Sequence, residues 1–430
     1  MASVAVRLPS ATSAPAASAT EPNGAVTRPR ALTSCAKSAL LPRQSLTLRA
    51  KPAQPKSKSR VCAARPAITA SAASAPEYLE ALLDAPPAVA RQEVTAFAPA
   101  TVANLGPGFD FLGCAVEGLG DHVTARILDV PAPPSGNIII ESIEGDNGRL
   151  GFDPATNCIG IAARATMELL GLYGPDGKGS GTASDSKSGS NLPVIGLTLN
   201  KGLPLGSGLG SSAASAAAAA VAVNALFGSP LSKAQLVLAG LQSEAAVSGY
   251  HADNVAPALM GGFVLVRSYR PLHLIPLAFG GESGGEGKKL FFVVVTPAFE
   301  APTKEMRAAL PKEITMASHV ANSSQAAALI HAIHTGDARL LGAALASDTI
   351  VEPRRSPLIP GMSAVKVAAK AAGAHGCTIS GAGPTAVAVV DSEEVGRAVG
   401  AAIVEAFQEQ GKLHAKATVA ALDAVGGRVV

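Results

Sequence analysis

Cysteine is scarce in this 430-residue chain, and no two cysteines form a pair such as Cys-x-x-Cys. The five cysteines are scattered, at Cys35, Cys62, Cys114, Cys158 and Cys377. This usage excludes a disulfide framework and a cysteine-based zinc site, and it fits a reducing compartment. No stretch of about 18 strongly apolar residues occurs either, so the sequence predicts no membrane span.

Acidic residues are almost absent from residues 1–76, where Glu21 stands against eleven lysines and arginines. Subtracting these from the totals of 32 acidic and 35 basic residues leaves 31 and 24, a net charge of −7 for the remainder. The positive balance of the whole chain therefore belongs to its first segment. Nucleic-acid binding by the rest of the chain loses its main electrostatic support.

That first segment is rich in Ala, Ser, Pro and Arg and has no apolar h-region. Such a composition is typical of an organelle transit peptide rather than a secretory signal, with an ordinary disordered tail as the alternative. Its length and the Val61-Cys62-Ala63-Ala64 stretch are similar to a chloroplast peptide cleaved near Cys62–Ala64. We therefore expect residues 1–75 to be a chloroplast transit peptide and disordered lead-in, and the mature protein to be in the plastid stroma.

The rest of the chain is organised around a glycine- and serine-rich loop, Pro204-Leu205-Gly206-Ser207-Gly208-Leu209-Gly210-Ser211-Ser212-Ala213-Ala214. The apolar run Val194–Leu199 before it predicts a strand, and the Ala- and Val-rich run Ser215–Leu226 after it predicts a buried helix. Converging backbone N–H groups and the helix dipole make such a loop a binding site for phosphate. A flexible Gly/Ser linker is the alternative, but a linker does not lie between a strand and a helix. Lys201 precedes the glycines and no Gly-Lys-Ser/Thr follows, so the loop is neither a Walker A motif nor a dinucleotide fingerprint.

Polar residues also gather beside other predicted strands. A strand at Val94–Ala98 leads into a Gly/Pro-rich turn that carries Asn104 and Asp110, and His251, Asp253 and Asn254 precede a predicted strand at Phe263–Val266. Binding residues of α/β folds are found at such turns, although Asn and Asp also favour turns on their own account.

Glu244 lies in the last turn of a helix predicted at Ser232–Val247. The helix dipole disfavours a carboxylate at this end. A bound metal ion would explain the position, and a solvated surface glutamate is the alternative.

The remaining pattern alternates strands and helices. Antiparallel strands are predicted at 121–127 and 136–143, and further strands at 290–295, 376–390 with a central glycine turn, and 415–422. Helices are predicted at 157–170 and 393–408, a surface loop at 174–191, and a linker between two domains at 269–286. No internal repeat is present.

The turn Ala100–Asp110, the glycine loop and the turn at Gly381 resemble, in this order, the three motifs of the GHMP kinases. The resemblance extends from about Val94 to Val430. The strings Ala-Thr-Val-Ala-Asn-Leu-Gly-Pro-Gly-Phe-Asp, His-Ala-Asp-Asn, Ala-Pro-Thr-Lys and Ile-Val-Glu-Pro are similar to those of plant-type homoserine kinases. This implies an α+β fold of two domains with the active site between them, an ATP-binding domain at 93–268 and a C-terminal domain at 288–430.

The resemblance implies phosphorylation of the L-homoserine hydroxyl by ATP, which gives O-phospho-L-homoserine for threonine biosynthesis. Loop residues Pro204–Ala214 would then bind the ATP phosphates, Asn157 would lie near the adenine, and Ser212 and Glu244 would hold Mg²⁺, a hard cation that prefers oxygen ligands.

Homoserine would be bound through each of its polar groups. The resemblance assigns its amine to Asp110, its hydroxyl to Asn104 and Asn254, its carboxylate to Arg307 and Arg355, and the lining of its pocket to His251 and Thr303. Arg354 is an alternative to Arg355, which has the Glu-Pro-x-Arg spacing of the family. Related kinases use an aspartate near Asp253 as a general base, whereas homoserine kinases are thought to work without one, so the base is left open.

Two alternative functions remain open for this sequence. The first is another small-molecule GHMP kinase, such as one acting on an isoprenoid precursor, and the second is a non-enzymatic GHMP protein that senses nucleotide. The expected partners are L-homoserine and ATP, with no nucleic acid and no membrane. The oligomeric state is left open, with a homodimer as one candidate.

Overall fold

The computed structural model describes residues 85–134, 136–173, 192–247, 249–281 and 289–430. The transit peptide predicted at 1–75 and the surface loop predicted at 174–191 lie outside these residues. Helices and strands are interspersed throughout the described part, and the predicted α+β class is confirmed.

The larger of the two sheets in the described part contains seven strands. Their order is β11-β1-β2-β4-β3, with β5 pairing with β2 and β6 with β5. The strands are β1 (Glu93–Ala103), β2 (Leu112–Leu128), β3 (Ile138–Glu144), β4 (Val194–Asn200), β5 (Phe263–Tyr269), β6 (Leu272–Leu277) and β11 (Arg428–Val429).

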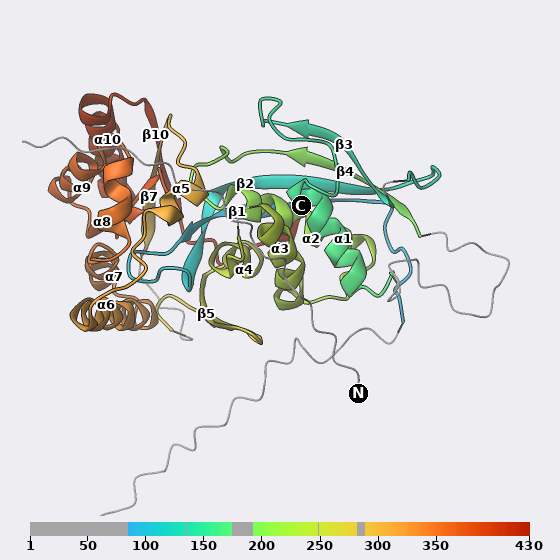
Figure 1. The fold of residues 1–430 in the computed structure, drawn as a ribbon, viewed down its shortest axis with the longest axis horizontal. Coiled ribbons are helices and arrows are strands. Elements are labelled where there is room, and N and C mark those ends of the chain that lie inside the picture. Colours follow the sequence, from blue (N-terminus) through green and yellow to red (C-terminus); the bar gives the residue numbers. More distant parts are fainter. Residues whose placement is uncertain (1–84, 135, 174–191, 248, 282–288) are drawn as a thin grey trace, which may run out of the picture. The chain divides into compact units, whose positions relative to one another are not determined.

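Helices α1 (Cys158–Leu169), α2 (Ser211–Leu226), α3 (Lys233–Val247) and α4 (Ala252–Met260) lie on one face of this sheet (Figure 1). All residues of α2 except Ser212 are buried, because its alanines let β1, β2 and the neighbouring helices approach from every side. Ala96, Val123 and Leu197 of the sheet pack with these helices in one apolar core. Helix α2 is therefore a fixed support for the glycine loop that precedes it.

Of two sequence predictions about the larger sheet, one is confirmed and the other is wrong. Strands β2 and β3 run antiparallel as predicted, but β4 lies between them, antiparallel to β2 and parallel to β3, and α1 supplies the crossover that parallel strands need. The predicted linker at 269–286 contains β6, which pairs antiparallel with β5. Leu272 and Leu274 are buried in that strand. The alternation of buried and less buried residues is short and lies in a Pro- and Gly-rich segment, so the sequence pattern does not predict a strand there.

The smaller sheet has the strand order β10-β7-β9-β8. Its strands are β7 (Phe291–Pro297), β8 (Gly376–Ile379), β9 (Ala386–Val390) and β10 (Ala415–Ala421). Its helices are α5 (Thr303–Ala308), α6 (Met316–Thr335), α7 (Ala338–Leu345), α8 (Glu352–Arg355), α9 (Met362–Ala371) and α10 (Glu393–Ala406), with a 3₁₀ turn at Ser356–Leu358 and a π turn at Phe407–Gly411.

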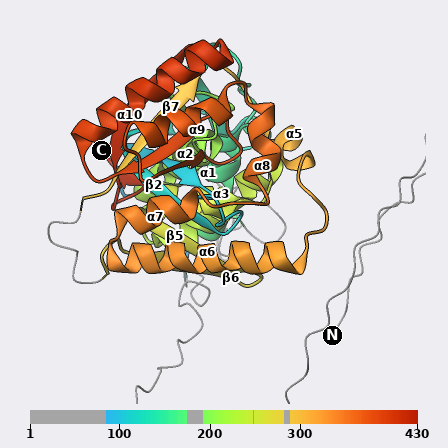
Figure 2. The same ribbon diagram turned by 90° about the vertical axis from the view of Figure 1, so that its left-hand side faces the viewer.

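Alternate residues of β7 serve two separate cores. Val293 and Val295 pack with α9 and α10, whereas Phe292 and Val294 pack with α6 and α7. Figure 2 shows α9 and α10 above α7 and α6. The sheet is thus covered on both faces.

The domain boundaries at 93–268 and 288–430 stay predictions. Strand β6 lies between them in the sequence, and β11, from the end of the chain, pairs antiparallel with β1 of the larger sheet. Among the described residues, no helix has the combination of length and apolarity that crossing a membrane requires.

Candidate active site

A cavity of about 360 Å³ is lined by the glycine loop, the turn after β1, the ends of α3 and α4, α5, α8 and the turn after β8. It brings together most of the predicted site residues: Asn104, Asp110, Asn157, Leu205, Gly206, Ser207, Gly208, Gly210, Ser211, Ser212, Glu244, His251, Asp253, Asn254, Thr303, Arg307 and Arg355. Four predicted loop residues do not line it: Pro204, Leu209, Ala213 and Ala214. Leu209 and both alanines point into apolar cores instead.

The glycine loop takes a conformation that only glycine adopts easily. Gly206, Gly208 and Gly210 have φ of 63°, 81° and 63°, in the left-handed region. A Cβ on Gly208 would lie 2.5 Å from the Ser380 carbonyl oxygen, and Ser380 Oγ donates a 2.8 Å hydrogen bond to the Gly208 carbonyl oxygen. The turn after β8 thus packs directly on the loop. Gly210 caps α2 without any side-chain hydrogen bond, so no capping side chain occupies the first amides of the helix, a position suited to an anion.

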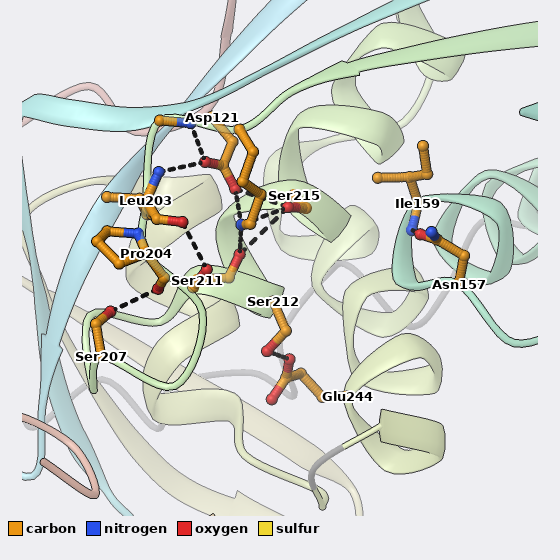
Figure 3. A network of polar contacts seen from close by, with 12 residues as sticks. Asp121, Asn157, Ile159, Leu203, Pro204, Ser207, Ser211, Ser212, Ser215 and Glu244 are labelled. Atoms are coloured by element: carbon orange, nitrogen blue, oxygen red, sulfur yellow. Dashed lines mark hydrogen bonds and ion pairs between the residues drawn. The ribbon is translucent and has the colours of Figure 1, made fainter. Parts of the chain in front are cut away.

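A buried polar network lies under this loop (Figure 3). Asp121 of β2 is fully buried and forms an ion pair with Lys201. Lys201 directly follows β4, at the point where the chain enters the loop. Ser215 of α2 donates a 2.6 Å hydrogen bond to Asp121 Oδ2. The network joins the sheet, the loop and the helix.

Ser212 and Glu244 meet at the edge of the cavity, where Ser212 Oγ donates a 2.5 Å hydrogen bond to Glu244 Oε1 (Figure 3). Only 3% of Glu244 is exposed, so the alternative of a solvated surface glutamate is wrong. Among the described residues, no group of three or more His, Cys, Asp or Glu could hold a metal by itself. Mg²⁺ usually binds one or two carboxylates together with substrate phosphates, so this pair of oxygen ligands fits the ion beside a bound nucleotide.

Arg307 of α5 and Asp110 form a two-pronged ion pair at the other end of the cavity. Arg307 Nη1 and Nη2 lie 2.9 and 2.8 Å from the two Asp110 oxygens, and Nη2 lies 2.8 Å from His251 Nε2. The hydrogen bonds to Asp110 raise the pKa of Arg307. A positive and a negative group thus lie side by side, each partly exposed.

Arg355 of α8 is buried next to this pair, whereas Arg354 is exposed. Its Nη1 donates a 3.0 Å hydrogen bond to the Gly381 carbonyl oxygen. Burial, followed by the positive charge of Arg307, lowers the pKa of Arg355 to about 10. Both guanidinium carbons lie near the Phe109 ring, 5.3 Å from its centroid for Arg307 and 5.0 Å for Arg355. The aromatic face stabilises two cations that would otherwise repel each other.

Three of the predicted polar residues are fixed by neighbours. Asn104 Nδ2 donates to the Gly381 carbonyl oxygen at 2.8 Å, and Asn254 Oδ1 accepts from Thr101 Oγ1 at 3.0 Å. Asn157 caps α1: its Oδ1 accepts from the Ile159 amide at 3.1 Å. Its Nδ2 donates to the Gly151 carbonyl oxygen at 2.7 Å, so its side chain shapes this end of the cavity.

Asp253, in the first turn of α4, is a buried carboxylate at the cavity wall. Only 2% of it is exposed, and Oδ1 finds no hydrogen-bond partner among the described residues. Burial, assisted by the negative charge of Asp110, raises its pKa to about 7. Tyr269 lies nearby, with its OH donating to the Asp110 carbonyl oxygen at 3.0 Å. An aspartate of this kind can gain or lose a proton at neutral pH.

The sequence prediction missed Asp121, Phe109 and Tyr269 as parts of the site. Asp121 is read as an ordinary strand residue, 80 residues before Lys201. Phe109 stands inside a recognised motif, but a ring between two arginines cannot be inferred from spacing.

Comparison with known proteins agrees with this geometry. Residues 180–262 match the GHMP kinases N terminal domain, and residues 329–409 match the GHMP kinases C terminal domain. A homoserine kinase of Arabidopsis thaliana is 61% identical over 337 residues, which is 78% of this chain and 84% of the relative. One from Chloroherpeton thalassium is 39% identical over 79% of this chain and its own whole length.

Solved structures give the same result. The crystal structure of homoserine kinase from Cytophaga hutchinsonii superposes with a TM-score of 0.69 at 37% identity, covering 80% of this chain and 99% of that one. A mevalonate kinase from L. major has a TM-score of 0.55 at 16% identity, over 78% of this chain and 99% of that one, which shows a shared fold alone. The chain belongs to the homoserine kinase family of the GHMP kinases.

Proposed function

We propose that this protein transfers the γ-phosphoryl group of ATP to the hydroxyl of L-homoserine, giving O-phospho-L-homoserine and ADP. The observation that supports this most directly is the content of one cavity. A glycine loop suited to phosphates and a cluster of Asp110, Arg307 and Arg355 suited to an amino acid line the same space.

ATP occupies the loop end in this proposal. Backbone amides of the loop and of the start of α2 bind the phosphates, and the adenine lies near Asn157. Ser212 and Glu244 hold Mg²⁺, which neutralises negative charge on the phosphates and orients them when bound.

Homoserine binds at the other end by separating Asp110 from Arg307 and forming an ion pair with each of them. Its ammonium group takes the place of the guanidinium on Asp110, and its carboxylate takes the place of Asp110 on Arg307 and adds Arg355. The side chains of Arg307 and Asp110 are 41% and 35% exposed, and pairs at such exposure contribute about 1 kcal/mol or less, so the exchange costs little. His251 and Thr303 complete the walls of the pocket.

The chemical step then needs orientation and one proton transfer. Asn104 and Asn254 orient the homoserine hydroxyl towards the γ-phosphorus. A new P–O bond forms to that oxygen while the bond to the ADP oxygen breaks, and Asp253 accepts the hydroxyl proton. Its raised pKa supports this role, since a base with a pKa near the working pH transfers protons effectively. Transfer without a base is the alternative, in which orientation alone is sufficient.

An ATP-coupled assay of the protein lacking residues 1–75 tests the proposal. We expect L-homoserine to have the highest kcat/KM in a panel of hydroxy amino acids, mevalonate and the amino alcohol that lacks the carboxylate. A preference for mevalonate would support an isoprenoid kinase, and nucleotide binding without turnover would support a sensor.

We also propose the cellular setting. The product enters threonine biosynthesis, and residues 1–75 direct the protein to the chloroplast, an assignment supported by their basic, acid-poor composition and by the similarity to a plant relative. The protein in this proposal is divided into domains at 93–268 and 288–430 and forms a homodimer, which light scattering tests.

A further inference from the structure

We propose that Lys201 and Asp121 act together as a positioning pair that fixes the glycine loop before nucleotide binds, and that Lys201 is not a phosphate ligand. The inference rests on the proposed nucleotide site. Lys201 lines the cavity below the loop, where a lysine would ordinarily be interpreted as a ligand of ATP. The contacts of its ammonium group lead to a different role.

All three donors of the Lys201 ammonium group are used within the protein. Nζ donates to Asp121 Oδ2, to the Ser211 carbonyl oxygen at 2.7 Å and to Ser215 Oγ at 2.9 Å. An ammonium group has no more than three N–H donors, so none is left for a phosphate oxygen. The side chain is 1% exposed, and its charge is balanced by a carboxylate that is fully buried.

Asp121 holds both ends of the loop. Its Oδ1 accepts hydrogen bonds from the amides of Gly202 at 2.9 Å and Leu203 at 3.0 Å, where the loop begins. Its Oδ2 accepts from Lys201 and Ser215, and Lys201 in turn binds Ser211 at the start of α2. Figure 3 shows both groups of contacts meeting at this one carboxylate.

The backbone at Gly202 packs too closely against β2 to leave room for a side chain. A Cβ on Gly202 would lie 2.1 Å from the Gly120 carbonyl oxygen, so the loop begins in direct contact with β2. A loop held at its start and at its end has lost most of its freedom before ATP arrives, which lowers the entropy cost of binding. Because the pair is neutral overall, it adds no net charge that attracts the phosphates, whereas the loop amides and the start of α2 can bind them directly.

Charge-removing variants separate the two roles. Lys201→Met leaves a buried, unpaired Asp121 near the phosphates, and we expect it to weaken the Kd for a non-hydrolysable ATP analogue about 100-fold or more. Asp121→Asn keeps an acceptor for the Gly202 and Leu203 amides. The double variant Lys201→Met/Asp121→Asn should therefore recover to within 20-fold of the wild-type Kd, with the KM for homoserine changed less than threefold.

A phosphate ligand would behave differently, because removing it costs affinity whatever residue 121 is. A double variant that is folded but more than 20-fold weaker than wild type overturns the proposal. Lys366→Met/Glu352→Gln is the matched control, since Lys366 Nζ lies 2.8 Å from the buried Glu352 in the other half of the chain. It should leave the Kd of the ATP analogue unchanged.

Amine acylation of wild-type protein, read by mass spectrometry, decides the question even if the variants do not fold. Lys201 should be protected to the same extent with and without the ATP analogue. Protection that arises only on adding the analogue overturns the proposal. Wild-type protein that binds no ATP analogue at all would contradict the proposed function itself, which keeps the two failures distinct.

Discussion

Replacing Asp253 by Asn tests both the charge state and the chemical role proposed for this side chain. Asn has nearly the same shape as a protonated Asp and carries no charge. The wild-type carboxylate is buried with Oδ1 unpartnered among the described residues, so its ionisation is opposed by the fold. The variant should therefore be more stable than wild type wherever Asp253 is ionised in the unfolded chain.

The sign and size follow from the raised pKa. In the folded protein the pKa of Asp253 is raised from 3.8 to about 7. Below pH 4 the Asp253 carboxyl is protonated in both the folded and the unfolded protein. Between pH 4 and 7 only the folded protein keeps this proton, so the free energy of unfolding falls as the pH rises through this range. The difference between a pKa of 3.8 and one of about 7 corresponds to about 4 kcal/mol, which relaxation of the site can only reduce. The advantage of Asp253→Asn should grow from pH 4 to 7 and then level off.

Urea unfolding of wild type and variant from pH 4 to 8.5 measures that advantage, and kcat/KM for homoserine over the same range measures the chemical role. If Asp253 accepts the proton, Asp253→Asn should lower kcat/KM about 10²-fold or more at pH 8. The change in kcat/KM that the wild type shows near pH 7 should then be absent from the pH–rate profile of the variant. Asp348→Asn is the control. The oxygens of buried Asp348 accept from the Ile350 and Glu352 amides at 2.9 and 2.7 Å, so its loss should destabilise the protein at pH 8.

Two outcomes would refute this reasoning separately. A stability difference that does not change with pH would mean that Asp253 has no raised pKa. A normal stability profile combined with an unchanged pH–rate profile would leave the buried acid in place and favour transfer without a base.

Four shorter predictions concern the rest of the site. Arg307→Ala should lower kcat/KM for homoserine roughly 10–100-fold without affecting ATP binding; the further loss in the double variant with Arg355→Ala should be less than additive, and full activity of that double variant would contradict the pocket. Glu244→Gln should lower kcat about 10²-fold or more and change the Mg²⁺ titration while the Tm barely moves; unaltered Mg²⁺ dependence would exclude the metal role. Phe109→Leu should raise the KM for homoserine about fivefold to thirtyfold and leave that for ATP unchanged, and equal changes in both would indicate a general loss of structure. Deleting residues 2–75 should keep kinase activity and abolish chloroplast uptake, so import of the shortened protein would disprove the transit assignment.

The strand, glycine loop and helix around 194–226 could be predicted because each signal is local. The observed strand is β4 at Val194–Asn200, and α2 begins at Ser211, four residues before the predicted start, because Gly210 supplies the left-handed cap. Helix α6 was missed since its Ser-, Ala- and His-containing sequence has only Leu329, Ala332 and Ile333 fully buried. An element that packs along so little of its length leaves a weak periodic pattern.

Interactions across long sequence separations could not be predicted in the same way. Asp110 and Arg307 are 197 residues apart, and family resemblance placed both near the substrate without showing that they pair with each other. The partner strand of β3 depends on a crossover through α1. Burial of Asp253 depends on how α4, Tyr269 and the Asp110 turn pack together, and a sequence pattern contains none of these distances.

The cationic side chains at the two ends of the cavity differ in whether a carboxylate neutralises them, and this difference affects which substrates the protein selects. Among the described residues that line the loop end, Lys201 is neutralised by Asp121 and Arg149 by Glu300, so the loop amides are the groups left to bind the phosphates of any nucleotide. At the substrate end, Arg355 is buried with no carboxylate partner in the described residues, and its pKa is lowered to about 10 by burial and by Arg307. A carboxylate placed between the two arginines would relieve their repulsion and restore the pKa of Arg355. An alcohol without that carboxylate would leave the repulsion in place. We therefore expect substrate choice to follow the carboxylate more strictly than the hydroxyl chain, and an amino alcohol to lose more in kcat/KM than a hydroxy amino acid with one methylene more or less.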